Sequence, residues 1–262
     1  MAPTASSATK SPKKATTPAR VLYLYAISEV PKRAAPVISA EAIDGDALVE
    51  PVRCENYVCW VSRVAKDEFA DHIEDRMQDL EWLASAGLRH QRVVAEISSK
   101  LVTLPARFGT VFLSEDSLAA HVKERKRALR GAFERVAGAD EWGVKLFATA
   151  AAKAPATNAP ASGAEYLKRK AELLQPRSGK LDTEVREFVA RVKELAVAAS
   201  AGGKASAGQP GLIWHGSFLI RRKNRKKLEM VLRKYAKKWK DIRRIDCSGP
   251  WPPYSFVGQH VD

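Results

Sequence analysis

Cysteine is scarce in this sequence, and the few cysteines follow no pattern of clustered thiols. Cys54, Cys59 and Cys247 are too few for a disulfide scaffold. None belongs to a C-x-x-C pair, and none stands at metal-ligand spacing from a histidine. We therefore expect a protein of the reducing cytoplasm, without a thiol-bound metal or cofactor.

The sequence also lacks long apolar runs. Nowhere does it approach the roughly 18 consecutive apolar residues that a membrane span requires. Residues 1–20 contain Lys10, Lys13, Lys14 and Arg20 with no acid, and they hold no apolar stretch typical of a signal peptide. We predict a disordered basic tail over residues 1–20 and no membrane insertion.

Motifs of enzymatic chemistry are missing. We find no phosphate-binding glycine loop, no nucleophile elbow and no zinc pattern. Acids gather between Asp67 and Asp75, but His72 and Arg76 lie among them at helical spacing, which favours ion pairs on an exposed helix. His90 and His215 lack companion ligands. We predict no catalytic residue, no metal and no cofactor, and hence a protein that is not an enzyme.

Positive charge is plentiful and is concentrated in two places. Of the formal net charge of +14, residues 1–20 contribute +4, and residues 221–244 hold 13 basic against 2 acidic side chains. The rest of the chain is close to neutral. Since 45% of the residues are hydrophobic, this body is expected to have a packed core.

The first half of the chain mixes strand and helix patterns. Strands are predicted over residues 21–27, apolar on both faces, and near residues 47–53 and 57–64. The next segment, residues 67–87, repeats apolar residues at helical spacing, with Gly87 as its predicted stop. A further helix is predicted over residues 88–99.

Two short strands and a capped helix are predicted next. Residues 100–113 favour two β segments broken between Pro105 and Gly109. Ser114 is a predicted helix cap. The helix after it places Arg125 within an otherwise apolar stripe, which consists of Leu118, Val122, Leu129, Phe133 and Val136.

The pattern changes at a predicted domain boundary before residue 139. Residues 141–147 alternate as a half-buried strand, and residues 151–164 and 200–211 have the composition of linkers. Helical pattern lies between the two linkers. A strand over residues 212–220, the basic helix and a strand near residues 242–247 follow. This order predicts an α+β protein of two domains, 21–138 and 139–262, the second a small sheet with helices on one side.

Five stretches of the sequence together resemble one known family. They are YLYAI at Tyr23–Ile27, HQRVV at His90–Val94, LPARFGTVF at Leu104–Phe112, EWGVKLF at Glu141–Phe147 and GPWPPYSF at Gly249–Phe256. In this order they are similar to the gas vesicle protein GvpL/GvpF family, and the resemblance extends from about residue 21 to residue 257.

The resemblance implies an accessory protein of gas vesicles, the gas-filled protein shells that give microbes buoyancy. It implies two α+β domains, the second a modified ferredoxin-like (βαβαβ) fold, and no catalytic residues. The implied partners are the small hydrophobic shell protein and other accessory proteins, contacted during assembly in a chaperone-like or minor structural role. The implied location is the cytoplasm, in association with gas vesicles.

Two motifs offer candidate partner-binding residues. In LPARFGTVF, Arg107, Phe108 and Gly109 form either a contacting loop or a purely structural turn. In GPWPPYSF, consecutive prolines present aromatic residues to a partner or fasten the chain end onto the second domain. The candidates there are Trp251, Pro252, Pro253 and Tyr254.

The basic segment 221–244 has two interpretations. Its apolar residues fit one buried helix face, so its cations either form an ordinary solvated surface or bind an acidic partner through residues such as Lys234 and Lys238. The alternative function that we consider is nucleic-acid binding through the same residues and the N-terminal tail. Such binding would weaken steeply with salt.

Overall fold

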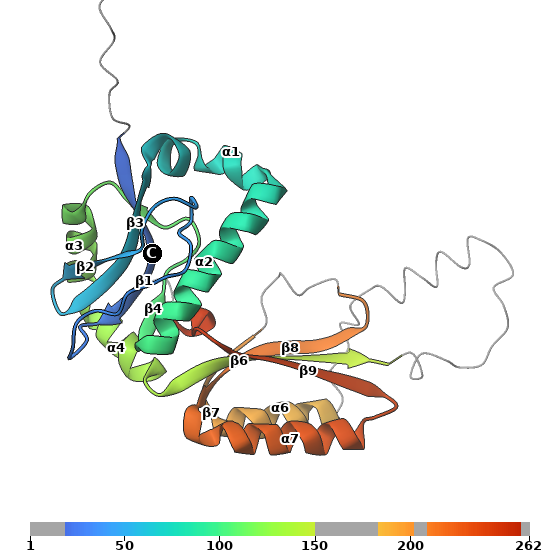
Figure 1. The fold of residues 1–262 in the computed structure, drawn as a ribbon. Coiled ribbons are helices and arrows are strands. Elements are labelled where there is room, and N and C mark those ends of the chain that lie inside the picture. The colour runs from blue at the N-terminus through green and yellow to red at the C-terminus, as the bar shows by residue number, and fades with distance from the viewer. Residues whose placement is uncertain (1–18, 150–182, 202–208, 258–262) are drawn as a thin grey trace, which may run out of the picture.

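The structure, a computed structural model, describes residues 19–149, 183–201 and 209–257 (Figure 1). Residues 1–18 of the predicted tail (1–20), the predicted linker at residues 151–164 and most of that at residues 200–211 lie outside these ranges. The prediction of a disordered tail is wrong at Arg20, which is the first residue of a strand (Arg20–Glu29).

The first half of the chain forms an antiparallel sheet around β1. The strands are β1 (Arg20–Glu29), β2 (Glu50–Cys54), β3 (Tyr57–Ala65), β4 (Thr103–Pro105) and β5 (Val111–Phe112). Their order is β2-β3-β1-β4, and β5 also pairs with β1. Residues 21–28 of β1 are all buried, as the unbroken apolar run predicts for a strand covered on both faces.

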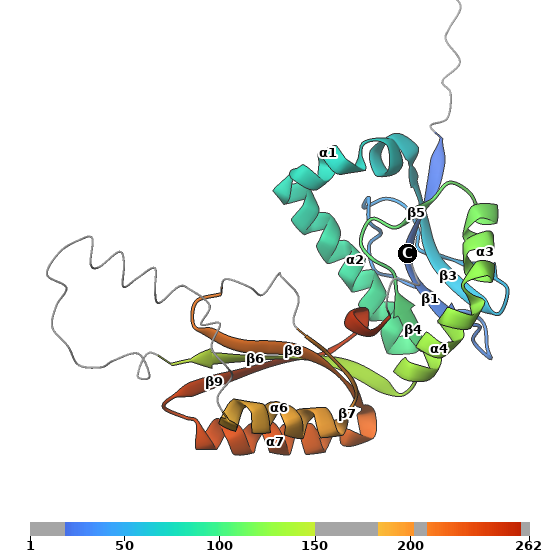
Figure 2. The ribbon, with the colours of Figure 1, turned by 180° about the vertical axis from the view of Figure 1, so that it is seen from behind.

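Helices cover both faces of this sheet (Figures 1 and 2). One face carries a π-helical turn at Asp67–Asp71, then α1 (Ile73–Gln78) and the long α2 (Leu80–Lys100). The other face carries α3 (Glu115–Glu124) and α4 (Lys126–Val136). Each layer of helices has its own cluster of buried apolar side chains against the sheet.

The predicted helix stop at Gly87 is wrong. α2 runs through Gly87 to Lys100 and begins instead at Asp79, whose carboxylate accepts hydrogen bonds from the backbone N–H groups of Glu81 and Trp82. A glycine inside a helix costs only about 0.5–1 kcal/mol. Burial of Val93, Val94 and Ile97 outweighs that cost.

The predicted cap at Ser114 is confirmed, and the apolar stripe after it is buried. Ser114 and Ser117 exchange hydrogen bonds between side chain and backbone. The helix is broken at Arg125, which ends α3 and precedes α4. The Arg125 side chain is only partly buried, and its guanidinium pairs with Glu124 at 3.1 Å, so the cation within the stripe has a partner.

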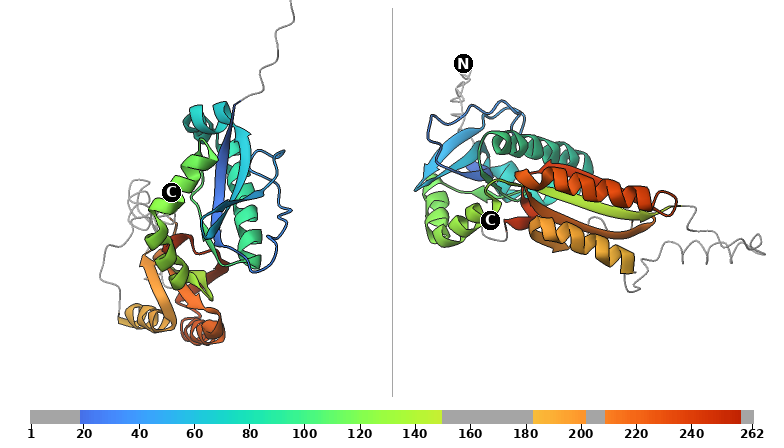
Figure 3. Two further views of the ribbon diagram at one scale, coloured as in Figure 1. Left: turned by 90° about the vertical axis from the view of Figure 1, so that its left-hand side faces the viewer. Right: turned by 90° about the horizontal axis from the view of Figure 1, so that it is seen from below.

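The second half of the chain forms another antiparallel sheet with its helices on one face (Figure 3). The strands are β6 (Ala139–Ala148), β7 (Ala196–Ala201), β8 (Leu212–Arg221) and β9 (Arg243–Trp251), in the order β7-β8-β6-β9. The helices are α6 (Thr183–Leu195) and α7 (Arg225–Lys238), with short 3-10 turns at Arg222–Asn224 and Tyr254–Phe256. Strand β7 was not predicted, and Ser200 and Ala201 belong to it rather than to a linker.

Side chains from the second half complete the core of the first. Ala139, Leu219, Phe256 and Val257 belong to the same buried cluster as residues of β1, α3 and α4. The C-terminal segment therefore packs between the two sheets (Figure 2).

Candidate functional site

The GPWPPYSF segment is fastened to the EWGVKLF strand by a buried carboxylate. Glu141, only 7% exposed, accepts hydrogen bonds from the Ser255 backbone N–H at 2.8 Å and from the Ser255 hydroxyl at 2.6 Å. On α4, Arg135 donates to the Phe256 carbonyl at 3.2 Å. This segment is thus held by both halves of the protein, whereas one of the two sequence-based interpretations fastened it to the second domain alone.

Close approach of β6 and β9 requires glycine at position 249. Gly249 has a φ of +136°, and a Cβ there would lie 2.8 Å from the Glu141 carbonyl oxygen and 3.1 Å from the Trp142 ring. Opposite on β6, a Cβ on Gly143 would lie 3.1 Å from the Ser248 hydroxyl. The two motifs consequently form one packed unit.

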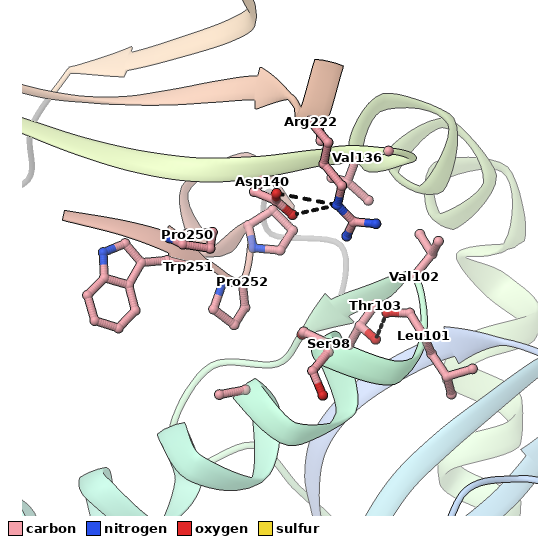
Figure 4. A pocket seen from close by; sticks show the side chains of 15 residues that line it. Ser98, Leu101, Val102, Thr103, Val136, Asp140, Arg222, Pro250, Trp251 and Pro252 are labelled. Atoms are coloured by element: carbon pink, nitrogen blue, oxygen red, sulfur yellow. Dashed lines mark hydrogen bonds and ion pairs between the residues drawn. The ribbon is translucent and has the colours of Figure 1, made fainter. Parts of the chain in front are cut away.

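A cavity of about 310 Å³ opens beside this segment, between β9 and the end of α2 (Figure 4). Its lining is mainly apolar and includes Leu101, Val102, Val136, Pro250, Pro252 and Pro253. The polar part of its wall is an ion pair between Arg222 and Asp140 at 3.1 Å. The hydroxyl of Ser98 is buried and has no hydrogen-bond partner among the described residues.

Trp251 lies at the edge of this cavity and is 41% exposed. Its indole N–H donates to the Ser248 hydroxyl at 3.1 Å, which fixes the ring on the surface of the strand. Pro252 and Pro253 are buried, so they hold the segment in place while Trp251 remains open to a partner.

The LPARFGTVF loop is anchored to β1. Gly109, with a φ of +86°, donates its backbone N–H to the Tyr23 hydroxyl at 3.2 Å. Phe108 packs edge-on against the rings of Tyr23 and His90. Arg107 at the tip of the turn is exposed. Of the three candidate residues in this loop, only Arg107 is exposed, whereas Phe108 and Gly109 are half-buried.

His90 joins three of the motifs that the sequence analysis singled out. Its Nδ1 lies 2.9 Å from the Tyr23 hydroxyl, and its ring centroid is 5.8 Å from that of Phe108 and 6.4 Å from that of Tyr254. Burial lowers the pKa of His90 to about 4, so the imidazole is neutral at pH 7. Tyr25 stacks on the same ring.

The tyrosines of this cluster remain protonated. Burial raises the pKa of Tyr23 and Tyr254 well above the usual value, and it raises that of Tyr25 to about 12. Tyr25 donates to the Ser62 hydroxyl at 3.1 Å and accepts from the Ile43 backbone N–H at 2.8 Å. These neutral, hydrogen-bonded groups hold strands and loops together.

The candidate lysines lie on α7, on the side of the second sheet away from the first sheet (Figure 1). Lys238 pairs with Glu184 of α6 at 2.8 Å, and the same carboxylate accepts from the Trp239 indole and from Arg243. Lys234 is exposed and makes no ion pair within the ranges that the structure covers. These lysines therefore belong to a different surface from Trp251.

Several cavity residues had no signal in the sequence. Ser98 and Leu101 end a helix, and Asp140 and Arg222 are 82 residues apart. Only the packing of the two sheets brings them together. In the part of the chain that the structure describes, no group of three or more potential metal ligands occurs, and no helix is long and apolar enough to cross a membrane.

A family model described as gas vesicle synthesis protein GvpL/GvpF matches residues 21–258. A curated relative, gas vesicle protein L from Streptomyces sp. (strain CB03234), is 28% identical over 254 residues, which cover 91% of this chain and 93% of the relative.

Two solved structures share the fold. The gas vesicle protein GvpF from Anabaena sp. PCC7120 superposes with a TM-score of 0.64 at 18% identity, covering 91% of this chain and 96% of its own. GvpF from Microcystis aeruginosa superposes with a TM-score of 0.59 at 16% identity, covering 90% and 98%. The arrangement of helices around two antiparallel sheets is therefore common to all three.

Proposed function

This chain belongs to the gas vesicle synthesis protein GvpL/GvpF family, and we propose that it is a cytoplasmic accessory protein that binds the small hydrophobic shell protein and other accessory proteins while gas vesicles form. The observation that carries this proposal is the family match over residues 21–258, which includes all of the described helices and strands except the first residue of β1.

The chemistry of the conspicuous residues supports binding rather than catalysis. His90 is neutral, largely buried and surrounded by aromatic rings, and the buried Glu141 is occupied by two hydrogen bonds from Ser255. Groups used in this way stabilise a fold and are not poised for proton transfer. We therefore propose a role without enzymatic activity.

The binding surface that we propose centres on Trp251. This exposed indole adjoins a cavity whose walls are mainly proline and aliphatic side chains, a setting suited to an apolar side chain of a partner. Tyr254, 39% exposed, and Arg107 are candidates for further contacts. Phe108, Gly109, Pro252 and Pro253 would act indirectly, by fixing the backbone that presents these residues.

We further propose that the two sheets mark two domains, 21–138 and 139–262, and that the second has a modified ferredoxin-like fold. Its helices α6 and α7 lie on one face of a four-stranded antiparallel sheet, which supports this assignment. Residues 1–20 belong to neither of the two proposed domains.

The direct test is co-purification of the tagged protein with the shell protein from cells that form gas vesicles, together with deletion of its gene. We expect the shell protein to be recovered with the tagged chain, and we expect the deletion to abolish or reduce gas vesicles. Reproducible absence of the shell protein, with normal vesicles after deletion, would refute the proposed function.

A further inference from the structure

The outer surface of α7 carries a row of cations with an apolar residue near its centre. Lys226, Met230, Arg233 and Lys237 follow one another at intervals of four, three and four residues, which places them within about 60° of one another on a helix. The opposite side of α7 is buried through Leu228 and Tyr235. The four residues point away from the sheet, and we call them the α7 row.

None of the three cations in the α7 row is neutralised within the described ranges. No ion pair joins Lys226, Arg233 or Lys237 to an acid, whereas Arg225 pairs with Glu229 and Lys238 with Glu184. Met230, between them, is 63% exposed. An exposed thioether among unpaired cations is a surface that gains both apolar burial and charge neutralisation when covered.

The spacing of the α7 row fits a partner helix. The intervals of four, three and four residues in the α7 row average about 3.7, close to the 3.6 residues per turn of a helix, so the row runs almost parallel to the axis of α7 and can contact a partner helix along its length. With 14 residues, α7 offers about 21 Å of such a contact line. Carboxylates at intervals of three and four residues on the partner helix would pair with the cations, and an apolar residue between them would pack against Met230.

The neighbouring helix limits the width of the positive surface. α6 packs beside α7, with the rings of Phe188 and Tyr235 at 5.1 Å. Its exposed residues include Glu187 and Glu194 but also Arg186, Arg191 and Lys193, and Arg191 pairs with Glu194 at 3.1 Å. A single helix is about 10–12 Å across with its side chains and fits on α7 alone. A nucleic-acid duplex is wider and would extend over α6, where Arg186, Arg191 and Lys193 only offset the three glutamates, so this helix adds little further attraction for phosphates.

We propose that the α7 row is a docking surface for an acidic amphipathic helix of another protein. The inference adds to the proposed function a surface distinct from Trp251, and it rests on that function only in assuming that the chain works through protein contacts. A second copy of this chain that docked through α7 is a poorer occupant, because the two α7 helices would bring the same excess of cations against one another.

The test uses the full-length protein and a fluorescein-labelled synthetic helix of about 21 residues, with Glu and Leu placed at alternating intervals of three and four so that they share one face. A second peptide of the same composition has these residues in scrambled order. Fluorescence anisotropy measures binding to wild-type protein and to the triple variant Lys226→Glu, Arg233→Glu, Lys237→Glu. The matched control, Lys32→Glu, Lys123→Glu, Arg127→Glu, makes the same change of net charge at exposed cations elsewhere.

We expect the ordered peptide to bind wild-type protein, and we expect the α7-row variant to bind about tenfold more weakly, as the loss of several surface ion pairs predicts. The control variant should stay within about twofold of wild type, since its cations lie off the row. Met230→Ala, which leaves the charge unchanged, should weaken binding about threefold through lost apolar contact. The scrambled peptide should bind more weakly than the ordered one.

Three results would overturn the proposal. One is equal loss of binding in both triple variants, which would make net charge the cause. Another is tighter, row-dependent binding of a DNA duplex than of the ordered peptide, and the third is self-association of the wild-type chain that the α7-row variant lacks. Because purified protein and peptide suffice, failure here leaves the gas vesicle role untouched, and normal vesicles after gene deletion would leave this docking surface standing.

Discussion

Glu141 on β6 and Ser255 near the C-terminus are 114 residues apart, yet they are joined by two hydrogen bonds to one buried carboxylate. Because Ser255 directly follows the segment that presents Trp251 and Tyr254, Glu141 positions the proposed binding surface without touching a partner. The same segment also contacts α4 through Arg135, so contacts with both halves of the protein hold it in position.

Replacing Glu141 should loosen the chain end. Glu141→Ala leaves the backbone N–H and hydroxyl of Ser255 without their acceptor, and we expect a loss of about 1–3 kcal/mol in the free energy of unfolding. Urea denaturation measures this loss, and limited proteolysis should cut the variant near the C-terminus first. Glu134→Ala, an exposed change on α4, is the control. Equal stability of the two variants would contradict the role that we assign to Glu141.

Replacing glycine by alanine should change the stability of the protein in opposite directions at positions 249 and 87. Gly249→Ala forces a side chain into a positive-φ site against the Glu141 carbonyl, and we expect it to destabilise the protein by about 2 kcal/mol or more. In Gly87→Ala, the added Cβ has no atom within 4 Å, and the change should stabilise the protein by about 0.5–1 kcal/mol because glycine is unfavourable inside α2. Thermal unfolding of the two variants should show a lower melting temperature for Gly249→Ala and a higher one for Gly87→Ala than for wild type. A shift of the same sign for both would show that local conformation does not determine the effect.

His90 should make stability fall in acid. Its pKa is about 4 in the folded protein and about 6.5 when unfolded, so below pH 6.5 the unfolded state takes up the proton more readily. Its stabilising contribution is complete above pH 6.5 and is lost as the pH falls to 4, a change of about 3 kcal/mol.

Urea unfolding of wild type and of His90→Gln between pH 7.5 and 4.5 tests this expectation. The variant is less stable at pH 7.5 but should lose less on acidification, because its side chain does not titrate. The same substitution at the half-buried His215 is the control. If wild type and His90→Gln have parallel pH profiles, burial of His90 is not the source of the acid sensitivity.

Trp251 should matter for gas vesicles more than for stability. Because its ring is partly exposed, we expect Trp251→Ala to cost less than about 1 kcal/mol in unfolding free energy while reducing gas vesicle yield in a strain that lacks the native gene. Leu48→Ala, which removes an 83% exposed side chain elsewhere, is the matched control. A normal yield with Trp251→Ala would remove this residue from the proposed binding surface.

Most elements of the fold could be predicted from local patterns. The unbroken apolar run of residues 21–27 became the buried central strand β1, and the alternation of Trp142, Val144 and Leu146 became the buried face of β6. Local chemistry also placed the cap at Ser114. These predictions succeed because the periodicity of side chains directly reflects which face of an element is buried.

The errors arose where packing overrode a local signal. Gly87 is a helix breaker by preference, but the buried side of α2 continues beyond it. Strand β7, with the sequence AVAASA, has no strong strand pattern and exists because β8 offers it a free edge for pairing.

The sequence alone determined the family, the charge distribution and the helix and strand of most segments, because each of these depends on neighbouring residues or on motifs in fixed order. Only the tertiary structure decided which motifs meet. It placed His90 between Tyr23, Phe108 and Tyr254, tied Glu141 to Ser255 and separated Lys234 from Trp251. Contacts between residues far apart in the chain depend on how the two sheets pack, and side-chain periodicity carries no information about that packing.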